Sequence, residues 1–162
     1  MPSTGLRVVR KLLAPAEGTK NPMDEVAFQE WVELTNLLGR YITSVESNDF
    51  TELGNCFTPD AVIDVLGQGG PVCHGRDEAV AAIRARRLAT GRDIRRHLLS
   101  NLTIQKLSPD RFRCQSSLLV VFTPISGDPS VVLTGKYDDI AVRESDGNWR
   151  LASRILRRDT PT

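Results

Sequence analysis

The residue pattern of this chain changes partway along its length, from a helical repeat to long strand-like runs. Between Asp24 and Ser47, apolar residues recur every three or four positions, which predicts an amphipathic helix. From His97 onward, the apolar residues instead fall into runs that suit extended strands. Helices followed by strands, rather than alternating with them, favour an α+β domain.

The expected elements are three helices and a set of strands. The first helix covers 24–47, the second is short and starts at an N-cap on Asp49, and the third covers 77–88. A strand over 61–66, a glycine-rich loop over 67–71 and a short segment over 72–74 precede the third helix. The long strands are expected over 97–107, 111–123, 131–144 and 148–157.

The sequence "SDGN" predicts a tight turn between the last two strands. With Asp146 and Gly147 in the turn, Asp139 is expected opposite Arg154, as a cross-strand ion pair, and Val142 opposite Leu151. The apolar face of this hairpin is expected to pack against the helices; it carries Ile140, Val142, Trp149, Leu151 and Ile155. The other face carries Tyr137, Asp139, Arg150 and Arg154.

Composition excludes several classes of protein. The chain has 162 residues, 40% of them hydrophobic, with a formal net charge of +1, which suits one globular domain without a strong field for nucleic acid or membranes. No apolar run approaches the roughly 18 to 20 residues of a membrane helix. There is no GxGxxG, Walker or GxSxG motif, so no motif indicates nucleotide binding or α/β-hydrolase chemistry.

The three cysteines are an odd number and lack CxxC spacing. A disulfide framework or a metal site is therefore not expected, although Cys73 lies next to His74, and a reducing, cytoplasmic location is the default. Residues 1–23 are too interrupted for a secretory signal and are expected to form an arm, placed against the body or against a neighbouring subunit.

Glu46 and His97 are the two residues that the pattern leaves unexplained. The helical stripe consists of Phe28, Trp31, Leu34, Leu38, Ile42 and Val45, with Glu33 on the opposite side. Glu46 projects from inside this stripe, where an unpaired buried carboxylate would cost several kcal/mol. Either the helix frays there and Glu46 reaches water, or Glu46 faces a partner across a cavity.

His97 opens a strand on which Leu99 and Asn101 are expected to share its face, with Asn101 about 13 Å away. Such a mixed face is typical of a ligand cavity with a few polar groups. Either His97 is a proton-transfer group in that cavity, or it is a histidine that packing tolerates. His74, at the entry to the third helix, is either an exposed loop residue or a second pocket residue.

Four segments, in this order, resemble the SnoaL-like branch of the nuclear-transport-factor-2-like superfamily: "YITSVESNDFTELGNCFTPDAVIDV", "HGRDEAVAAI", "RHLLSNLTI" and "GKYDDIAVRESDGNWRLASRIL". The resemblance spans about residues 26–158 and implies a cone-shaped α+β barrel, in which a curved mixed sheet wraps around three N-terminal helices and leaves a pocket open at one end. It divides the chain into the arm, 1–23, and a domain, 24–162.

The resemblance also implies site residues. His97 matches the histidine that works with a carboxylate in the dehydratases and the dehydrochlorinase of this family. Glu46 stands in place of their aspartate, one methylene longer, and Tyr41 matches a tyrosine that some members carry. The remaining residues expected to bind a substrate are Asn101, Trp31, Val65 and Leu99.

The implied function is cofactor-independent proton abstraction from a small, largely apolar molecule, followed by elimination, isomerisation or cyclisation. The alternative is a non-catalytic ligand-binding or supporting subunit, like the small subunits of ring-hydroxylating dioxygenases, which share the fold. A homo-oligomer, either a trimer or a dimer, is expected in both cases.

The segment "RARRLATGRDIRR" holds six arginines and one acid, Asp93. The arginines are Arg84, Arg86, Arg87, Arg92, Arg95 and Arg96. Either they form a solvated helix end that complements the helix dipole, or they contact an anion, such as a carboxylated or phosphorylated substrate or an acidic partner surface. Nucleic acid is not expected, because no aromatic platform accompanies them.

Overall fold

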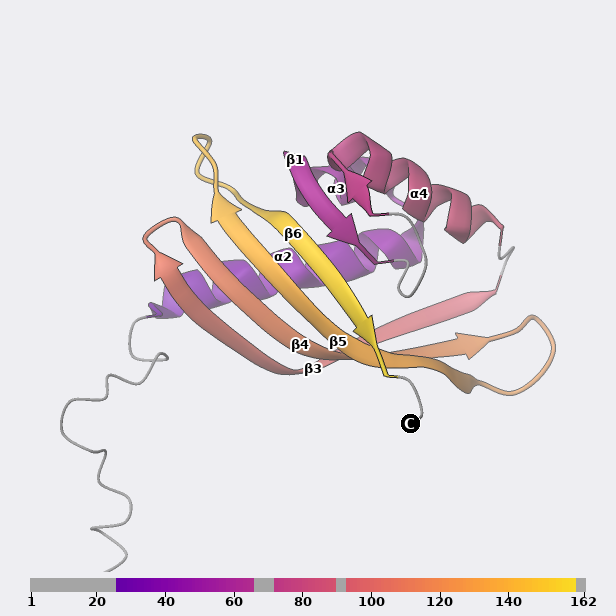
Figure 1. Cartoon of the computed structure of the whole chain (residues 1–162). Coiled ribbons are helices and arrows are strands. Elements are labelled where there is room, and N and C mark those ends of the chain that lie inside the picture. The colour runs from indigo at the N-terminus through magenta and orange to yellow at the C-terminus, as the bar shows by residue number, and fades with distance from the viewer. Residues whose placement is uncertain (1–25, 66–71, 90–92, 160–162) are drawn as a thin grey trace, which may run out of the picture.

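The structure is a computed structural model that describes residues 26–65, 72–89 and 93–159 (Figure 1). The predicted arm at 1–23, the glycine-rich loop at 67–71 and Arg92 lie outside the described residues. No helix of the described part is both long and apolar enough to cross a bilayer.

The described residues form three helices and six strands. The helices are α2 (Phe28–Ser47), α3 (Phe50–Asn55) and α4 (Arg76–Leu88). The strands are β1 (Phe57–Asp64), β2 (Cys73–His74), β3 (Ile94–Ser108), β4 (Arg111–Thr123), β5 (Ser130–Arg143) and β6 (Trp149–Arg158). The order of elements expected from the sequence is confirmed, and Asp49 caps α3 by accepting a hydrogen bond from the Glu52 amide at 2.9 Å.

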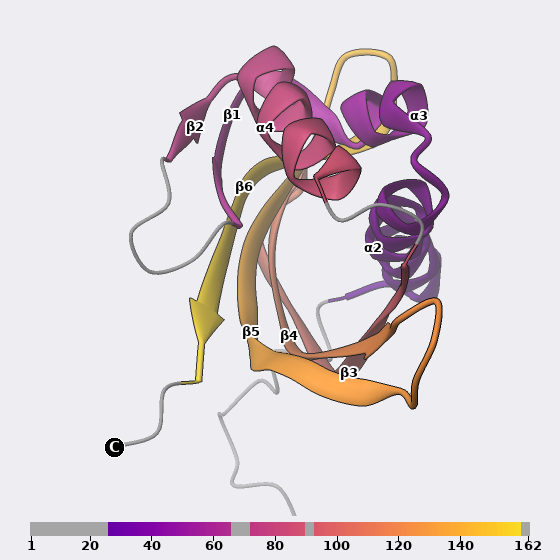
Figure 2. The same ribbon diagram turned by 90° about the vertical axis from the view of Figure 1, so that its right-hand side faces the viewer.

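The strands form one mixed sheet in the order β2-β1-β6-β5-β4-β3. β1 runs parallel to β6, and all the other neighbours are antiparallel. Figure 2 shows the sheet curving so that α2 lies across its open side and α4 lies over one end. This arrangement is the cone-shaped α+β fold that the sequence predicts.

The apolar face of α2 is rotated from the predicted stripe. Its buried side chains include Leu37 and Tyr41, whereas Phe28 and Trp31 are 79% and 42% exposed. Glu33 does not lie on the outer side of the helix as predicted, because its Oε2 accepts hydrogen bonds from the Trp149 indole at 2.8 Å and from Arg143 at 3.1 Å. These polar partners on β5 and β6 draw the carboxylate toward the sheet.

The β5–β6 hairpin confirms one predicted pair and corrects another. Next to the turn, Leu151 faces Ala141 and not Val142 as predicted. An extra residue in β6, Ala152, then shifts the register, so that Asp139 faces Arg154, as predicted. The predicted face is also wrong in part: Tyr137, Asp139 and Arg154 point to the interior, as Trp149 and Leu151 do, whereas Ile140, Val142 and Ile155 are only half-buried. The two hydrogen bonds between Arg154 and Asp139 allow this charged pair to lie inside the protein.

A second bulge, in β3, separates Asn101 from His97. Asn101 has a φ of 51°, a left-handed conformation that asparagine adopts more readily than most residues, and the register shifts between Ser100 and Thr103. The extra residue turns Asn101 outward, where it is exposed, while Leu102 and Ile104 continue the inward face. The expectation that His97 and Asn101 share a face is therefore wrong.

Replacing Gly135 with alanine is expected to destabilise the fold. A Cβ atom there would lie 2.5 Å from the backbone oxygen of Arg157 on β6, so two hydrogen-bonded strands would have to separate. Strain of this kind typically costs about 1–3 kcal/mol. Urea unfolding of Gly135→Ala measures the loss, and Gly39→Ala, where nothing lies within 4 Å of the added atom, is the control. An equal change in the two variants would contradict the steric explanation.

Candidate active site

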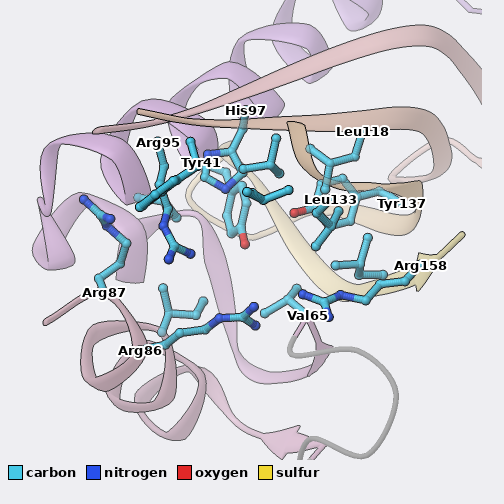
Figure 3. Close-up of a pocket in the computed structure, with 16 residues that line it drawn as sticks. Tyr41, Val65, Arg86, Arg87, Arg95, His97, Leu118, Leu133, Tyr137 and Arg158 are labelled. Carbon is cyan, nitrogen blue, oxygen red and sulfur yellow. The ribbon is translucent and has the colours of Figure 1, made fainter. Parts of the chain in front are cut away.

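A cavity of about 350 Å³ lies between the inner face of the sheet and the helices α2 and α4 (Figure 3). Its size is that of a small ligand pocket. Much of the wall is apolar and includes Val45, Ile83, Leu118, Val120, Leu133 and Leu156. The polar lining consists of His97, Tyr41, Tyr137 and the four arginines Arg86, Arg87, Arg95 and Arg158.

His97 is held against Glu46 on the wall of this cavity. Glu46 is the penultimate residue of α2, and His97 lies near the start of β3. The Glu46 Oε1 atom accepts a hydrogen bond from the backbone N–H of His97 at 2.6 Å and lies 3.4 Å from His97 Nδ1. Both side chains are only 15% exposed. The second carboxylate oxygen, Oε2, accepts a hydrogen bond from Arg96 at 3.1 Å.

The 3.4 Å contact is an ion-pair distance rather than a formed hydrogen bond, since Nδ1 has no hydrogen-bond partner among the described residues. It nevertheless fixes which edge of the ring faces the carboxylate. A proton on Nδ1 is favoured there, which leaves Nε2 as the unprotonated nitrogen of the ring. Catalytic hydrogen bonds in ligand-free proteins are often longer than in the working complex.

The surroundings of His97 favour its neutral form. Burial lowers the pKa of His97 below its ordinary value of 6.5, and the Glu46 carboxylate, which raises this pKa, only partly offsets burial; the positive charges of Arg87 and Arg95 lower it further. A neutral imidazole at physiological pH is the form that can accept a proton.

Two buried phenols line the same cavity. Tyr41 and Tyr137 are 3% and 4% exposed, their ring centroids are 6.4 Å apart, and Figure 3 shows both hydroxyls in the cavity. Burial raises the pKa of both tyrosines, so each keeps its proton near neutral pH. Two protonated phenols can donate hydrogen bonds to a negatively charged oxygen that develops on a bound molecule.

A fully buried ion pair between Arg154 and Asp139 packs against the rings of the two tyrosines. Arg154 donates to both carboxylate oxygens of Asp139, at 2.9 and 2.7 Å, and both side chains are 0% exposed. The Arg154 guanidinium also lies 3.9 Å from the Tyr41 ring centroid and 4.2 Å from that of Tyr137. Burial alone would lower the pKa of Arg154, but the Asp139 carboxylate outweighs burial and holds it above its ordinary value.

The structure brings together some of the predicted site residues and not others. His97, Tyr41 and Val65 line the cavity, and Glu46 lies behind His97. Leu99 does not line the cavity itself, but it packs against a cluster of lining residues, Leu118, Val120, Tyr137 and Leu156. Trp31, Asn101 and His74 are exposed away from the cavity lining.

Sequence reasoning missed Tyr137 and Arg158 as cavity residues. Tyr137 is predicted on the face away from the helices, together with Asp139, but the register next to the turn, where Arg143 faces Trp149, turns both side chains inward. Arg158 comes from the end of β6, far in sequence from the arginine-rich segment. The sequence "KYDDI" contains one signal for Tyr137. Tyr137 and Asp139 alternate onto the same face of the strand, so a buried Asp139–Arg154 pair would also place Tyr137 inside.

The cysteines offer no alternative nucleophile at this site. None of them lines the cavity, and burial raises the pKa of Cys56 to about 11 and that of Cys114 to about 12. Among the described residues, no three histidine, cysteine or acidic side chains gather in the manner of a metal centre.

The fold and the cavity together define a protein of the class in which a curved sheet and its helices enclose a small-molecule pocket. A family model for the SnoaL-like domain matches residues 28–155. The chain belongs to this SnoaL-like family, which includes dehydratases and cyclases.

Sequence relatives and a solved structure agree with this membership. The uncharacterized protein Rv2910c of Mycobacterium tuberculosis is 31% identical over 128 residues, covering 76% of this chain and 82% of that protein. The anthranilate 1,2-dioxygenase small subunit of Burkholderia cepacia is 26% identical over 137 residues, covering 78% and 85%. A scytalone dehydratase-like protein of Novosphingobium aromaticivorans has the same fold, with a TM-score of 0.71 at 22% identity over 83% of this chain and 87% of that chain.

Proposed function

We propose that this protein is a cofactor-independent enzyme that removes a proton from a carbon atom next to a carbonyl group in a small, largely apolar molecule. The observation that carries the proposal is the placement of His97. Its ring lies on the wall of a mainly apolar cavity, has a carboxylate behind it, and shares the cavity with two protonated phenols.

Each residue has one step in the proposed reaction. His97 Nε2 takes the proton from carbon, and the electron pair of the broken C–H bond moves into the carbonyl group to give an enolate. Glu46 orients the imidazole and stabilises the imidazolium as it forms, without touching the substrate. Tyr41 and Tyr137 donate hydrogen bonds to the enolate oxygen.

The outcome depends on the substrate. In an elimination, the enolate expels a hydroxyl group from the β-carbon, and the imidazolium returns its proton to that group, so that water leaves. In an isomerisation, the imidazolium returns the proton to a different carbon. We propose elimination or isomerisation, since both need only the base and the oxyanion donors, and cyclisation would require a second carbonyl in the same molecule.

A deuterium-exchange experiment tests proton abstraction without knowledge of the natural substrate. The probe is 2-tetralone, an apolar bicyclic ketone with activated C–H groups, in buffered D₂O. We expect the protein to accelerate the loss of the C1 proton signal in NMR spectra, with saturation at high probe concentration. A rate equal to that of buffer alone, for 2-tetralone and a panel of other cyclic ketones that are shown to bind, would contradict the proposal.

The pH dependence of this exchange is expected to follow His97. The base works only when neutral, so the rate should rise with pH through the pKa of His97, which lies below 6.5, and stay constant above it. A rate that keeps rising between pH 7 and 9 would exclude His97 as the base.

Replacing Glu46 with glutamine is expected to lower the exchange rate and to move the rising limb of this profile to lower pH. The Glu46 charge raises the pKa of His97, so its loss lowers that pKa further. A charged hydrogen-bonding partner typically contributes about 1.5–3 kcal/mol, or roughly 10- to 100-fold in rate. A rate loss with an unchanged profile would assign Glu46 a structural role only. Glu30→Gln, another α2 carboxylate, which pairs with Lys106 away from the cavity, is the control.

A second candidate function is a non-catalytic supporting subunit. The similarity to the small subunit of anthranilate 1,2-dioxygenase favours it, since the name of that relative describes a subunit rather than a complete enzyme. Under this alternative, ligands bind to wild type and to a His97 variant equally, and none of them exchanges a proton.

A further inference from the structure

Four arginines line one side of the cavity. Arg86 and Arg87 come from α4, Arg95 from β3 and Arg158 from β6, and Figure 3 shows their side chains spread around the cavity. All four are only partly buried, so they form a rim that solvent reaches. The predicted anion contact concerns all six arginines of the arginine-rich segment. Of these, Arg86, Arg87 and Arg95 line the cavity, and the structure adds Arg158.

Three of these arginines make no ion pair with any described residue: Arg86, Arg95 and Arg158. The Nε atoms of Arg95 and Arg158 are buried and have no hydrogen-bond partner among the described residues. The guanidinium of Arg95 does lie over the Phe122 ring, at 5.5 Å from its centroid. Buried donors without partners are rare in folded proteins and call for an explanation.

Other arginines of the described chain have carboxylate partners. Arg113 pairs with Asp138 at 2.6 Å, Arg150 with Asp146 at 2.7 Å, and Arg154 with Asp139 at 2.7 Å. Arg96, directly beside Arg95 in sequence, pairs with Glu46 at 3.1 Å. Among the described residues, arginines elsewhere thus form ion pairs with carboxylates, whereas these three at the cavity form none.

The cluster is unfavourable without a bound anion. Burial lowers the pKa of Arg86, and the positive charges of Arg158 and Arg95 lower it further. Burial also lowers the pKa of Arg95, as does Arg87, and the negative charge of Asp93 offsets this only in part. Like charges at a partly desolvated site repel one another, and a bound anion would remove that repulsion and satisfy the free donors.

We propose that the molecule bound in this cavity carries an anionic oxyacid group, which the rim formed by Arg86, Arg95 and Arg158 binds, while its apolar body lies along the inner wall. The inference rests on the proposed function for the identity of the site and extends it by naming the substrate class. Binding of the anion at the rim orients the body, so that the reacting carbon lies toward His97 and the phenols.

A matched pair of fluorescent probes separates the anionic group from the apolar body. 8-Anilino-1-naphthalenesulfonate and N-phenyl-1-naphthylamine share one skeleton, and only the first carries a sulfonate. Titration of wild type and of Arg86→Gln, Arg95→Gln and Arg158→Gln gives the ratio of the two affinities for each protein. Arg84→Gln, an exposed arginine on α4 outside the cavity lining, is the control.

We expect each rim variant to bind the sulfonate probe about 3- to 10-fold more weakly and the neutral probe as well as wild type does. Arg84→Gln should change neither affinity. Added salt should weaken binding of the sulfonate probe alone. Competition by 2-naphthoate and 2-naphthyl phosphate, with 2-naphthamide as the neutral reference, then shows which oxyacid the rim prefers.

Two results would overturn the inference: rim variants that retain wild-type affinity for the sulfonate probe, or variants that lose affinity for both probes equally while thermal melting shows them folded. Neither result bears on proton abstraction. Conversely, the protein could prefer the anionic probe and yet exchange no ketone protons. That result would support anion binding at the rim and contradict the proposed function.

Discussion

Replacing His97 with glutamine is expected to lower the deuterium-exchange rate by about 10²- to 10⁴-fold, the range typical for loss of a general base. Glutamine has a similar size and keeps a hydrogen-bonding group but cannot accept a proton at neutral pH. Because Glu46 accepts its short hydrogen bond from the backbone N–H of residue 97, the variant should keep that contact and fold normally. NMR exchange rates measured at several probe concentrations separate the loss of turnover from a loss of binding.

The other histidine of the chain provides the matched control for this variant. His74 is exposed on β2 and lies outside the cavity lining, so His74→Gln should exchange protons at the wild-type rate. If His97→Gln retains more than a third of the wild-type rate, or if both histidine variants lose activity equally, His97 is not the base.

Replacing Arg154 with methionine is expected to destabilise the fold by about 3–5 kcal/mol, because it leaves the Asp139 carboxylate buried without a partner. The Arg154 guanidinium also packs against the rings of Tyr41 and Tyr137, so those contacts change as well. Urea unfolding followed by tryptophan fluorescence measures the change, with Trp149 buried in the core as the reporter.

A double variant and a neighbouring pair test whether the lost charge partner is the cause. Asp139→Leu combined with Arg154→Met removes both buried charges and should recover much of the stability lost in the single variant. Arg113→Gln breaks the adjacent pair with Asp138, which is partly exposed, and should move the unfolding midpoint little. A double variant as unstable as Arg154→Met would show that packing, and not an unpaired charge, dominates.

The sequence predicts the elements well because their signals are local. The period of α2, the Asp49 cap and the turn at Asp146 and Gly147 each depend on a few neighbouring residues. The structure confirms the opposition of Asp139 and Arg154, which depends on the extra residue in β6 as well as on the turn. The family resemblance then predicts the cone shape of the fold. The helical and strand periodicity of the sequence alone does not distinguish this shape from other α+β folds.

The bulges mark where counting along a strand fails. An extra residue reverses the inward and outward sides of a strand, and nothing in the sequence around Asn101 or Ala152 fixes its position. Asn101 thus leaves the cavity, whereas Leu99, before the bulge, stays on its inner side. The arm at residues 1–23, the homo-oligomer and the cytoplasmic location stay predictions.

The hydrogen bond from the residue 97 amide to Glu46 has an evolutionary consequence. The backbone N–H of residue 97 holds the Glu46 carboxylate in place. Another side chain can therefore replace the imidazole without loss of this contact between α2 and β3. In a descendant of such a chain, a single substitution can remove the imidazole and leave the cavity in place. The same fold can therefore become a non-catalytic subunit of another protein without a change in its helices and sheet.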